Sequence, residues 1–535
     1  MKKNFILLIA LLFTAIGFSQ EDAWVYFKNK PDTQYYFDNP LEMLSQRALD
    51  RRTMQNIPLD VKDVPIHQDY IDQISAVVEV MAKSKWLNAV HVRGSVDDIN
   101  STSALAFVDH IDFANHALNS GRPSAAHNVQ KTMDIEINFP YGGSSNQIQM
   151  LNGHLLHQQN FTGSGKIIAV LDAGFPGVDT EAPFARLHNN NLILGGYNFV
   201  DRDNNFYTRN SHGTMVLSTM GGYVTNQLVG TAPDASYYLF ITEDADQETP
   251  LEESLWVEAA ETADSLGVDV INTSLGYFDY DNPNYSHTYE EMDGVTTFIA
   301  RGADIAFSRG MVVVVSAGNS GSDDEAHMHI ATPADAVNVL TVGAVDSFGN
   351  YAAFSSIGPS YDGRIKPDVA AKGLGATVAN AQGNVVTASG TSFSGPIIAG
   401  MVATFWQAVP SFTNAQVVQY IKESASQFDN PDFELGYGIP DFAQAYQAAL
   451  LSVPQNTASR FKVYPNPVTD NLIISLPSTI PSAKVSIYNA LGQSVSEKEI
   501  TIDTPSANLE SLQNGVYFYK ITSAAATQSG TLIKQ

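Results

Sequence analysis

The sequence of 535 residues contains no cysteine. Disulfide bonds, a thiol nucleophile and a thiolate metal site are therefore excluded, and stability must come from packing, bound ions and low backbone entropy. Basic residues are also scarce, with 29 Lys and Arg against 56 Asp and Glu, which gives a formal net charge of −27. This charge would repel nucleic acid, so we expect no nucleic-acid partner.

Beyond the N-terminus, no apolar run in the sequence is long enough to cross a bilayer. Residues 1–20 have the pattern of a signal peptide, with Lys2 and Lys3 before an apolar core at residues 5–18 and predicted cleavage at Gln20. The core is too short for a stop-transfer helix. We therefore expect an exported, soluble mature protein without a membrane span.

The negative charge is concentrated in one part of the chain. Residues 144–450 hold 10 basic and 34 acidic residues, a net charge of −24, whereas residues 451–535 hold 6 and 5, a net charge of +1. A domain boundary is therefore predicted near Leu451. The acidic part should attract Ca²⁺ or cationic partners, although an acidic surface that only aids solubility explains the charge equally well.

Residues 144–450 alternate between buried-strand and helix patterns. Apolar runs predict strands at residues 167–171, 268–272, 311–315 and 337–342, and helices at residues 251–266, 298–309, 393–408 and 414–426. This alternation predicts an α/β domain with a parallel sheet covered by helices on both faces. Ligands bind such sheets beyond the carboxyl ends of the strands.

Two smaller units flank this domain. Residues 21–112 combine a basic helix at residues 44–52 with short apolar runs, which predicts a small α+β unit. Residues 113–143 form a turn-rich linker. Residues 457–535 contain short alternating strands separated by Pro, Gly and Asn turns, which predicts an all-β sandwich.

Four polar side chains lie where a strand or a loop meets a predicted helix. Asp172 ends the first strand of the α/β domain, and Asn319 follows a later one. His212 begins a helix of small residues. Ser392 is expected at the start of its helix, where free N–H groups and the helix dipole stabilise an alkoxide or an oxyanion.

The residues around these positions are DAG at Asp172, HGT at His212, SAGNSG at Asn319 and GTSFSGP at Ser392. In this order they resemble the motifs of the subtilisin-like serine peptidases, the S8 family. The resemblance implies a subtilisin-like fold and a catalytic triad of Asp172, His212 and Ser392. It also implies an oxyanion hole formed by Asn319 and the backbone N–H of Ser392.

The segment NTSLG at residues 272–276 resembles the substrate-binding strand of the same family. Ser274, Leu275 and Gly276 would then pair with an extended peptide, and Ala317 and Gly318 would form the opposite wall of the primary pocket. Leu275 could equally be an ordinary core residue.

The resemblance extends to both flanking units. Residues 21–112 would be an inhibitory pro-domain, removed by cleavage within residues 113–143, with a permanent accessory domain as the alternative. The segments YPNPVTDNL, VSIYNALGQ and NGVYFYKI of the last unit resemble the C-terminal sorting domain of proteins exported by the type IX secretion system. A glycan-binding or adhesive sandwich is the alternative there.

No cofactor is expected for the chemistry, and the resemblance allows a structural Ca²⁺. The acidic runs at residues 201–203, 244–246 and 323–325 lack the spacing of a dedicated calcium loop, so the metal ligands stay unknown. His327 and His329 have no evident third ligand. The histidines at positions 110, 116 and 127 share no face, and we expect surface residues there, not ligands.

We therefore predict a secreted serine endopeptidase, made as a zymogen, that hydrolyses peptide bonds in proteins. Its partners would be protein or peptide substrates, its own pro-domain and the type IX secretion machinery. It would reach the cell surface or the medium through the periplasm and the outer membrane. Two alternatives are a catalytically silent subtilisin-fold protein that binds ligands at the cell surface, and an esterase with the same triad.

Overall fold

The computed structural model describes residues 20–118, 139–325, 327–452, 461–476, 480–489, 493–523 and 527–535. The predicted signal peptide, except Gln20, and the middle of the predicted linker lie outside these residues. The chain forms two compact units, residues 1–449 and 450–535. Within the described ranges, no helix is both long and apolar enough to cross a membrane.

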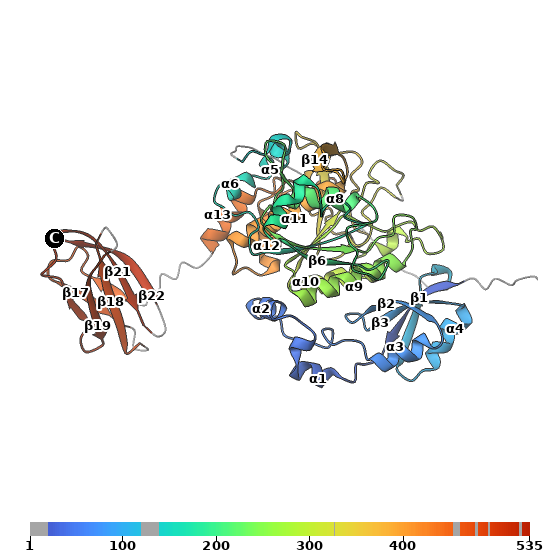
Figure 1. Ribbon diagram of the computed structural model, residues 1–535, viewed down its shortest axis with the longest axis horizontal. Helices are drawn as coiled ribbons and strands as arrows, with labels where there is room; N and C mark the ends of the chain where they lie inside the picture. The colour runs from blue at the N-terminus through green and yellow to red at the C-terminus, as the bar shows by residue number, and fades with distance from the viewer. Residues whose placement is uncertain are drawn as a thin grey trace, which may run out of the picture. The chain divides into compact units, whose positions relative to one another are not determined.

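A seven-stranded parallel sheet forms the centre of the first unit (Figure 1). Its strands, in spatial order, are β13 (Val369–Lys372), β12 (Leu340–Val345), β11 (Val312–Ser316), β10 (Val270–Thr273), β5 (Ile167–Asp172), β9 (Ser236–Ile241) and β6 (Ile193–Asn198). Strands β5 and β11 are buried along their whole length, which explains why both are apolar runs without alternation. The predicted parallel sheet is confirmed.

Helices cover both faces of this sheet. On one face, α8 (His212–Gly221) and α11 (Thr391–Ala408) pack against Val312 and Val314 of β11. On the other face, α9 (Leu251–Leu266) and α10 (Phe298–Ser308) pack against Val313 and Val315 of the same strand. Because successive residues of a strand point to opposite faces, one apolar run supports two separate cores.

Shorter elements complete this domain. They are α5 (Ser145–Gln149), α6 (His154–His157), α7 (Ala185–Asn189), β7 (Tyr223–Val224), β8 (Leu228–Val229), β14 (Ala376–Ala379), β15 (Val385–Ala388), α12 (Asn414–Glu423) and α13 (Phe442–Ser452). Helices α12 and α13 add Val417, Ile421 and Phe442 to the core beneath α11.

The N-terminal part of the first unit is an antiparallel sheet in the order β2, β3, β1, β4. Its elements are β1 (Glu21–Phe27), α1 (Thr33–Asp38), α2 (Gln46–Met54), α3 (Gln68–Ser75), β2 (Glu79–Ser84), β3 (Ala89–Gly94), α4 (Val96–Ser101) and β4 (Val108–Phe113). This arrangement agrees with the α+β unit expected from the sequence.

The N-terminal sheet packs directly against the domain that follows it. Ala23, Val25 and Phe27 of β1 face its own core, whereas Trp24 and Tyr26 join the core formed by α9 and α10. Figure 1 shows these two helices between the N-terminal sheet and the central sheet. All seven residues of β1 are therefore buried.

The second unit contains two antiparallel sheets around one apolar core. One sheet has the order β16 (Lys462–Tyr464), β17 (Asn471–Ser475) and β20 (Ser506–Asn508), and the other has the order β19 (Ser494–Thr501), β18 (Ser482–Tyr488), β21 (Gly515–Thr522) and β22 (Thr527–Lys534). Leu472 and Ile474 of the first sheet meet Val485 and Ile521 of the second. This part of the chain is all-β, as expected.

Candidate active site

Asp172 is the last residue of β5 and is fully buried. One oxygen of its carboxylate, Oδ1, accepts hydrogen bonds from Nδ1 of His212 at 2.7 Å and from the backbone N–H of Ala173 at 2.8 Å. Gly213 permits this close approach, because a Cβ at that position would lie 2.9 Å from Cβ of Asp172 and 2.5 Å from the carbonyl oxygen of Gly174. The contact between β5 and α8 thus places the carboxylate against the imidazole.

His212 is the first residue of α8. Its Nδ1 is held by Asp172, so its Nε2 is the nitrogen available to the cleft that His212 lines. Burial lowers the pKa of His212, but the negative charge of Asp172 and the hydrogen bond to it outweigh burial, and the pKa is raised. The pair therefore favours a charged imidazolium more than an isolated histidine does.

Ser392 is the second residue of α11 and lines a cleft of about 610 Å³ together with His212. Among the hydrogen bonds of the described residues, none joins the Ser392 hydroxyl to His212. Hydrogen bonds of this kind are commonly long in free enzymes and tighten when substrate binds. The helix begins after Gly390, which has a φ of +151° that favours glycine.

Asn319 follows β11 and lines the same cleft. Its Oδ1 accepts hydrogen bonds from the backbone N–H of Thr391 at 2.8 Å and from the Thr391 hydroxyl at 3.1 Å. Because the oxygen of the amide is engaged in this way, the Nδ2 group is the part left to donate toward the cleft. Asn319 and the N-terminus of α11 are therefore fixed to each other.

The walls of the cleft come from two neighbouring parallel strands, β10 and β11. Ser274, Leu275 and Gly276 follow β10, and Ala317 and Gly318 follow β11. All five residues line the cleft. The carboxyl ends of β5, β10 and β11 and the starts of α8 and α11 thus bring together the residues that the motifs singled out, as expected for a sheet of this type.

The acidic lining of the cleft was not placed at the site by the sequence, although the acidic charge of residues 144–450 and the run at residues 323–325 were evident there. Glu243, Glu248, Asp279 and Asp323 line it, and the described lining residues include no Lys or Arg. Burial, followed by the charge of Glu248, raises the pKa of Glu243. Glu243 and Glu248 follow β9, whereas Asp279 follows β10 and Asp323 follows β11, so no single local sequence pattern connects the four carboxylates.

Comparison with known proteins adds to this geometry. The family model described as "Subtilase family" matches residues 163–438, which include all the residues of the cleft discussed above. The chain belongs to the subtilase family.

Two further family models match the flanking parts of this subtilase. The model described as "Peptidase S8 propeptide domain, Bacteroidota" matches residues 22–132, and the "Secretion system C-terminal sorting domain" matches residues 462–535. The predictions of a pro-domain and of a sorting domain are confirmed. The sorting domain assigns the subtilase to secretion, at the cell surface or outside the cell.

Curated relatives cover the central part of the subtilase. Subtilisin NAT of Bacillus subtilis subsp. natto and subtilisin E of Bacillus subtilis (strain 168) are each 32% identical over 312 residues, which is 58% of this chain and 71% of each relative. Subtilisin BL of Lederbergia lenta is 30% identical over 272 residues, 50% of this chain and 87% of the relative. The prediction of a secreted serine endopeptidase made as a zymogen is confirmed.

Metal ligands were left open by the sequence, and the acidic runs named there are engaged in ion pairs. Asp201 and Asp244 both pair with Arg209, at 2.6 and 2.8 Å, and Asp324 pairs with His327 at 2.6 Å. The single positive charge of Arg209 offsets only part of the charge of the first two carboxylates. These contacts assign no Ca²⁺ ligands to the acidic runs.

Elsewhere in the described part of the subtilase, two groups of side chains bring potential ligand atoms within 4.8 Å of one another. One group is Glu243, Glu248 and Glu252, and the other is His116, His287 and Glu291. Both oxygens of Glu252 already accept backbone N–H groups, from Asp244 and Thr249, at 2.8 Å each. In the other group only one oxygen of Glu291 accepts a backbone N–H, from Thr288 at 3.0 Å, so the histidine-containing group is the better candidate for a metal site.

Proposed function

We propose that Ser392, His212 and Asp172 form the catalytic triad of this secreted endopeptidase. The Ser392 oxygen attacks the carbonyl carbon of the substrate while Nε2 of His212 takes the hydroxyl proton. The same proton then passes to the leaving amine as the C–N bond breaks, and water hydrolyses the acyl enzyme by the same route. The 2.7 Å contact between Asp172 and His212, in a cleft shared with Ser392, supports this assignment most directly.

The oxyanion formed in each step would be stabilised by the Asn319 amide and the backbone N–H of Ser392. The two hydrogen bonds from Thr391 to the amide oxygen of Asn319 support this role, because they orient the amide before substrate binds. Preorganised donors of this kind stabilise the transition state without reorganisation.

An extended peptide would pair with residues 274–276 in the antiparallel sense, and Ala317 and Gly318 would form the opposite wall of the primary pocket. The position of these residues at the ends of β10 and β11 supports this assignment. Recognition would then rest mainly on main-chain hydrogen bonds. The acidic lining, which includes Glu248 and Asp323, adds a preference for cationic peptides.

The pro-domain would inhibit the enzyme until cleavage within residues 113–143 releases it. The burial of β1 against α9 and α10 supports an inhibitor that is built into the zymogen. The sorting domain would carry the chain through the periplasm and across the outer membrane by type IX secretion. The chemistry needs no cofactor, and a bound Ca²⁺, to which we assign no ligands, would act on stability alone.

Ser392→Ala tests the triad. The variant should neither hydrolyse casein nor process its own pro-domain, and a fluorophosphonate should label only the wild-type enzyme. Ser389→Ala is the matched control, because Ser389 is exposed and lies three residues away. An Ser392→Ala variant that matures at the wild-type rate in purified form would contradict the assignment. Equal turnover of peptides and simple esters would instead favour the esterase alternative.

A further inference from the structure

A cavity of about 890 Å³ lies between the N-terminal sheet and the peptidase domain. His116, His287 and Glu291 line this cavity. His116 comes from the pro-domain side, in the short 3₁₀ helix His116–Leu118 that follows β4, and its backbone N–H donates to the carbonyl oxygen of Asn284. His287 and Glu291 come from the loop of the peptidase domain before α10. His116 lies within residues 22–132, which match the propeptide model. The group therefore joins the pro-domain to the peptidase domain, and this inference rests on the proposed cleavage falling after His116.

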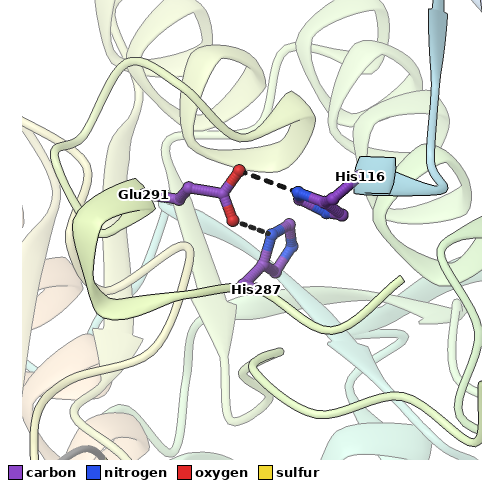
Figure 2. A group of neighbouring side chains, drawn as sticks. All are labelled: His116, His287 and Glu291. Atoms are coloured by element: carbon purple, nitrogen blue, oxygen red, sulfur yellow. Dashed lines mark ion pairs between the residues drawn. The ribbon is translucent and has the colours of Figure 1, made fainter. Parts of the chain in front are cut away.

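The two imidazoles face one carboxylate (Figure 2). Nδ1 of His116 lies 3.0 Å from Oε1 of Glu291, and Nδ1 of His287 lies 3.5 Å from Oε2 of the same residue. Zinc binds nitrogen and oxygen ligands at about 2.0–2.1 Å in a tetrahedron, which separates neighbouring ligand atoms by roughly 3.3 Å. One ligand atom of each residue lies within 4.8 Å of the other two, so rotation of the side chains alone would have to bring the three atoms to this spacing.

The orientation of His287 is an independent indication. Its Nε2 pairs with Oε1 of Glu253 at 2.9 Å, and the fully buried carboxylate of Glu253 is itself held by the Tyr280 hydroxyl at 2.7 Å and the Ile299 N–H at 3.0 Å. Nδ1 of His287 is buried, and among the described residues it makes only the long 3.5 Å ion pair with Glu291 and no hydrogen bond of normal length. Metal-binding histidines characteristically pair one ring nitrogen with a carboxylate and present the other to the metal.

From this geometry we infer that His116, His287 and Glu291 bind one divalent transition-metal ion, with zinc as the best fit, and that the ion fastens the pro-domain to the peptidase domain. Two imidazoles and one carboxylate suit zinc, whereas Ca²⁺ takes oxygen ligands. Three protein ligands leave a fourth position for water. The cavity provides a path by which the ion enters.

Zinc binding to the full-length chain tests the site. Titration of metal-free zymogen with Zn²⁺ alone, followed by calorimetry, should give one equivalent bound. His116→Ala should weaken binding by about 10-fold or more, and it should fold, because His116 is at the edge of the cavity and partly exposed. His110→Ala is the matched control, since His110 is exposed and pairs with Asp109 and Asp112 of its own strand. No bound zinc, or equal binding by His116→Ala, would overturn the inference.

Retention of the pro-domain tests what the metal does. After cleavage of the linker, Zn²⁺ should slow separation of the pro-domain from the peptidase domain in size-exclusion chromatography. A zinc-selective chelator should restore the rate of separation seen without Zn²⁺. In His116→Ala, Zn²⁺ should have no effect on separation, whereas an equal effect would refute the bridging role. Neither test measures peptide hydrolysis by Ser392, and intact and cleaved complexes contain the same three ligands. Both tests are therefore independent of the nucleophile assignment.

Discussion

The Ser274 hydroxyl donates a 3.1 Å hydrogen bond to the carbonyl oxygen of Ser392. In an α-helix this carbonyl would accept the N–H of the residue four positions later, which here is Pro396 and has no N–H. Ser274 satisfies the acceptor instead. The residue at the end of β10 is thereby tied to the residue that we assign as the nucleophile.

Ser274→Ala should leave the Ser392 carbonyl without a partner and loosen the start of α11. An unsatisfied buried acceptor costs about 1–3 kcal/mol, so we expect kcat to fall about 10-fold with a smaller change in KM. Steady-state kinetics on a peptide substrate measure this effect. Pro396→Ala restores an N–H at the right position, and the double variant should recover part of the loss. If Ser274→Ala keeps wild-type kcat, the hydrogen bond does not position Ser392.

The pH dependence of activity should report the contact between Asp172 and His212. Only the neutral imidazole accepts the Ser392 proton, so kcat/KM should rise with pH through the pKa of His212 in the free enzyme. Because that pKa is raised above its ordinary value of 6.5, the midpoint of the rise should lie above pH 6.5. A midpoint below pH 6.5 in the mature wild-type enzyme would contradict the charge-stabilised imidazolium.

Asp172→Asn separates the effect of the carboxylate charge on the pKa of His212 from the effect of burial. The substitution removes the negative charge and leaves the burial, which lowers the pKa. The midpoint should therefore move to lower pH, while kcat falls by roughly 10⁴-fold, the loss seen when a triad aspartate is replaced by asparagine. A variant with an unchanged midpoint would show that another group raises the pKa.

The acidic cleft predicts a preference for cationic peptides. Asp323→Asn should lower kcat/KM for a lysine-containing peptide about 2- to 5-fold relative to the same peptide with glutamine, since exposed charge pairs contribute about 0.2–1 kcal/mol. The difference should shrink as salt is added. Glu423→Gln, an exposed substitution in α12 away from the cleft, should not change the ratio. If both variants show the same ratio of kcat/KM for the lysine peptide to kcat/KM for the glutamine peptide, Asp323 does not contribute to the preference.

Much of this fold can be predicted from the sequence because its central strands are local signals. The run at residues 311–315 is buried on both faces and is apolar throughout, so it reads as a strand without tertiary information. Asp172 and Asn319 could be placed at one edge for the same reason, since each follows such a strand. Because the carboxyl ends of parallel strands lie at one edge of a sheet, the two side chains could be predicted to lie near each other.

Other features depend on contacts between distant segments and leave no local pattern. Strand β1 starts with Glu21 and Asp22, which are buried only because Tyr285, Asn115, His91 and Arg93 bond to them. His116 was expected to be a surface residue without ligand function, because its partners Glu291 and His287 lie in another domain. We now infer a different role for it from the geometry of that group.

The attachment of the pro-domain should depend on Arg52, one of two buried arginines of α2, both of which pair with Asp264. Arg52 pairs with Asp63 of the pro-domain and with Asp264 of α9, each at 2.8 Å, and all three side chains are buried. Arg47, on the same helix, pairs with Asp269 but is about a third exposed. Loss of one partner from a buried ion pair costs roughly 3–5 kcal/mol, whereas a partly exposed pair contributes about 0–1 kcal/mol.

Arg52→Ala should therefore lower the thermal stability of the uncleaved zymogen and speed release of the pro-domain after cleavage at least 100-fold. Arg47→Ala should change the release rate less than about 5-fold. Similar release rates for the two variants would mean that the apolar contacts of Trp24 and Tyr26, and not this ion network, hold the pro-domain in place.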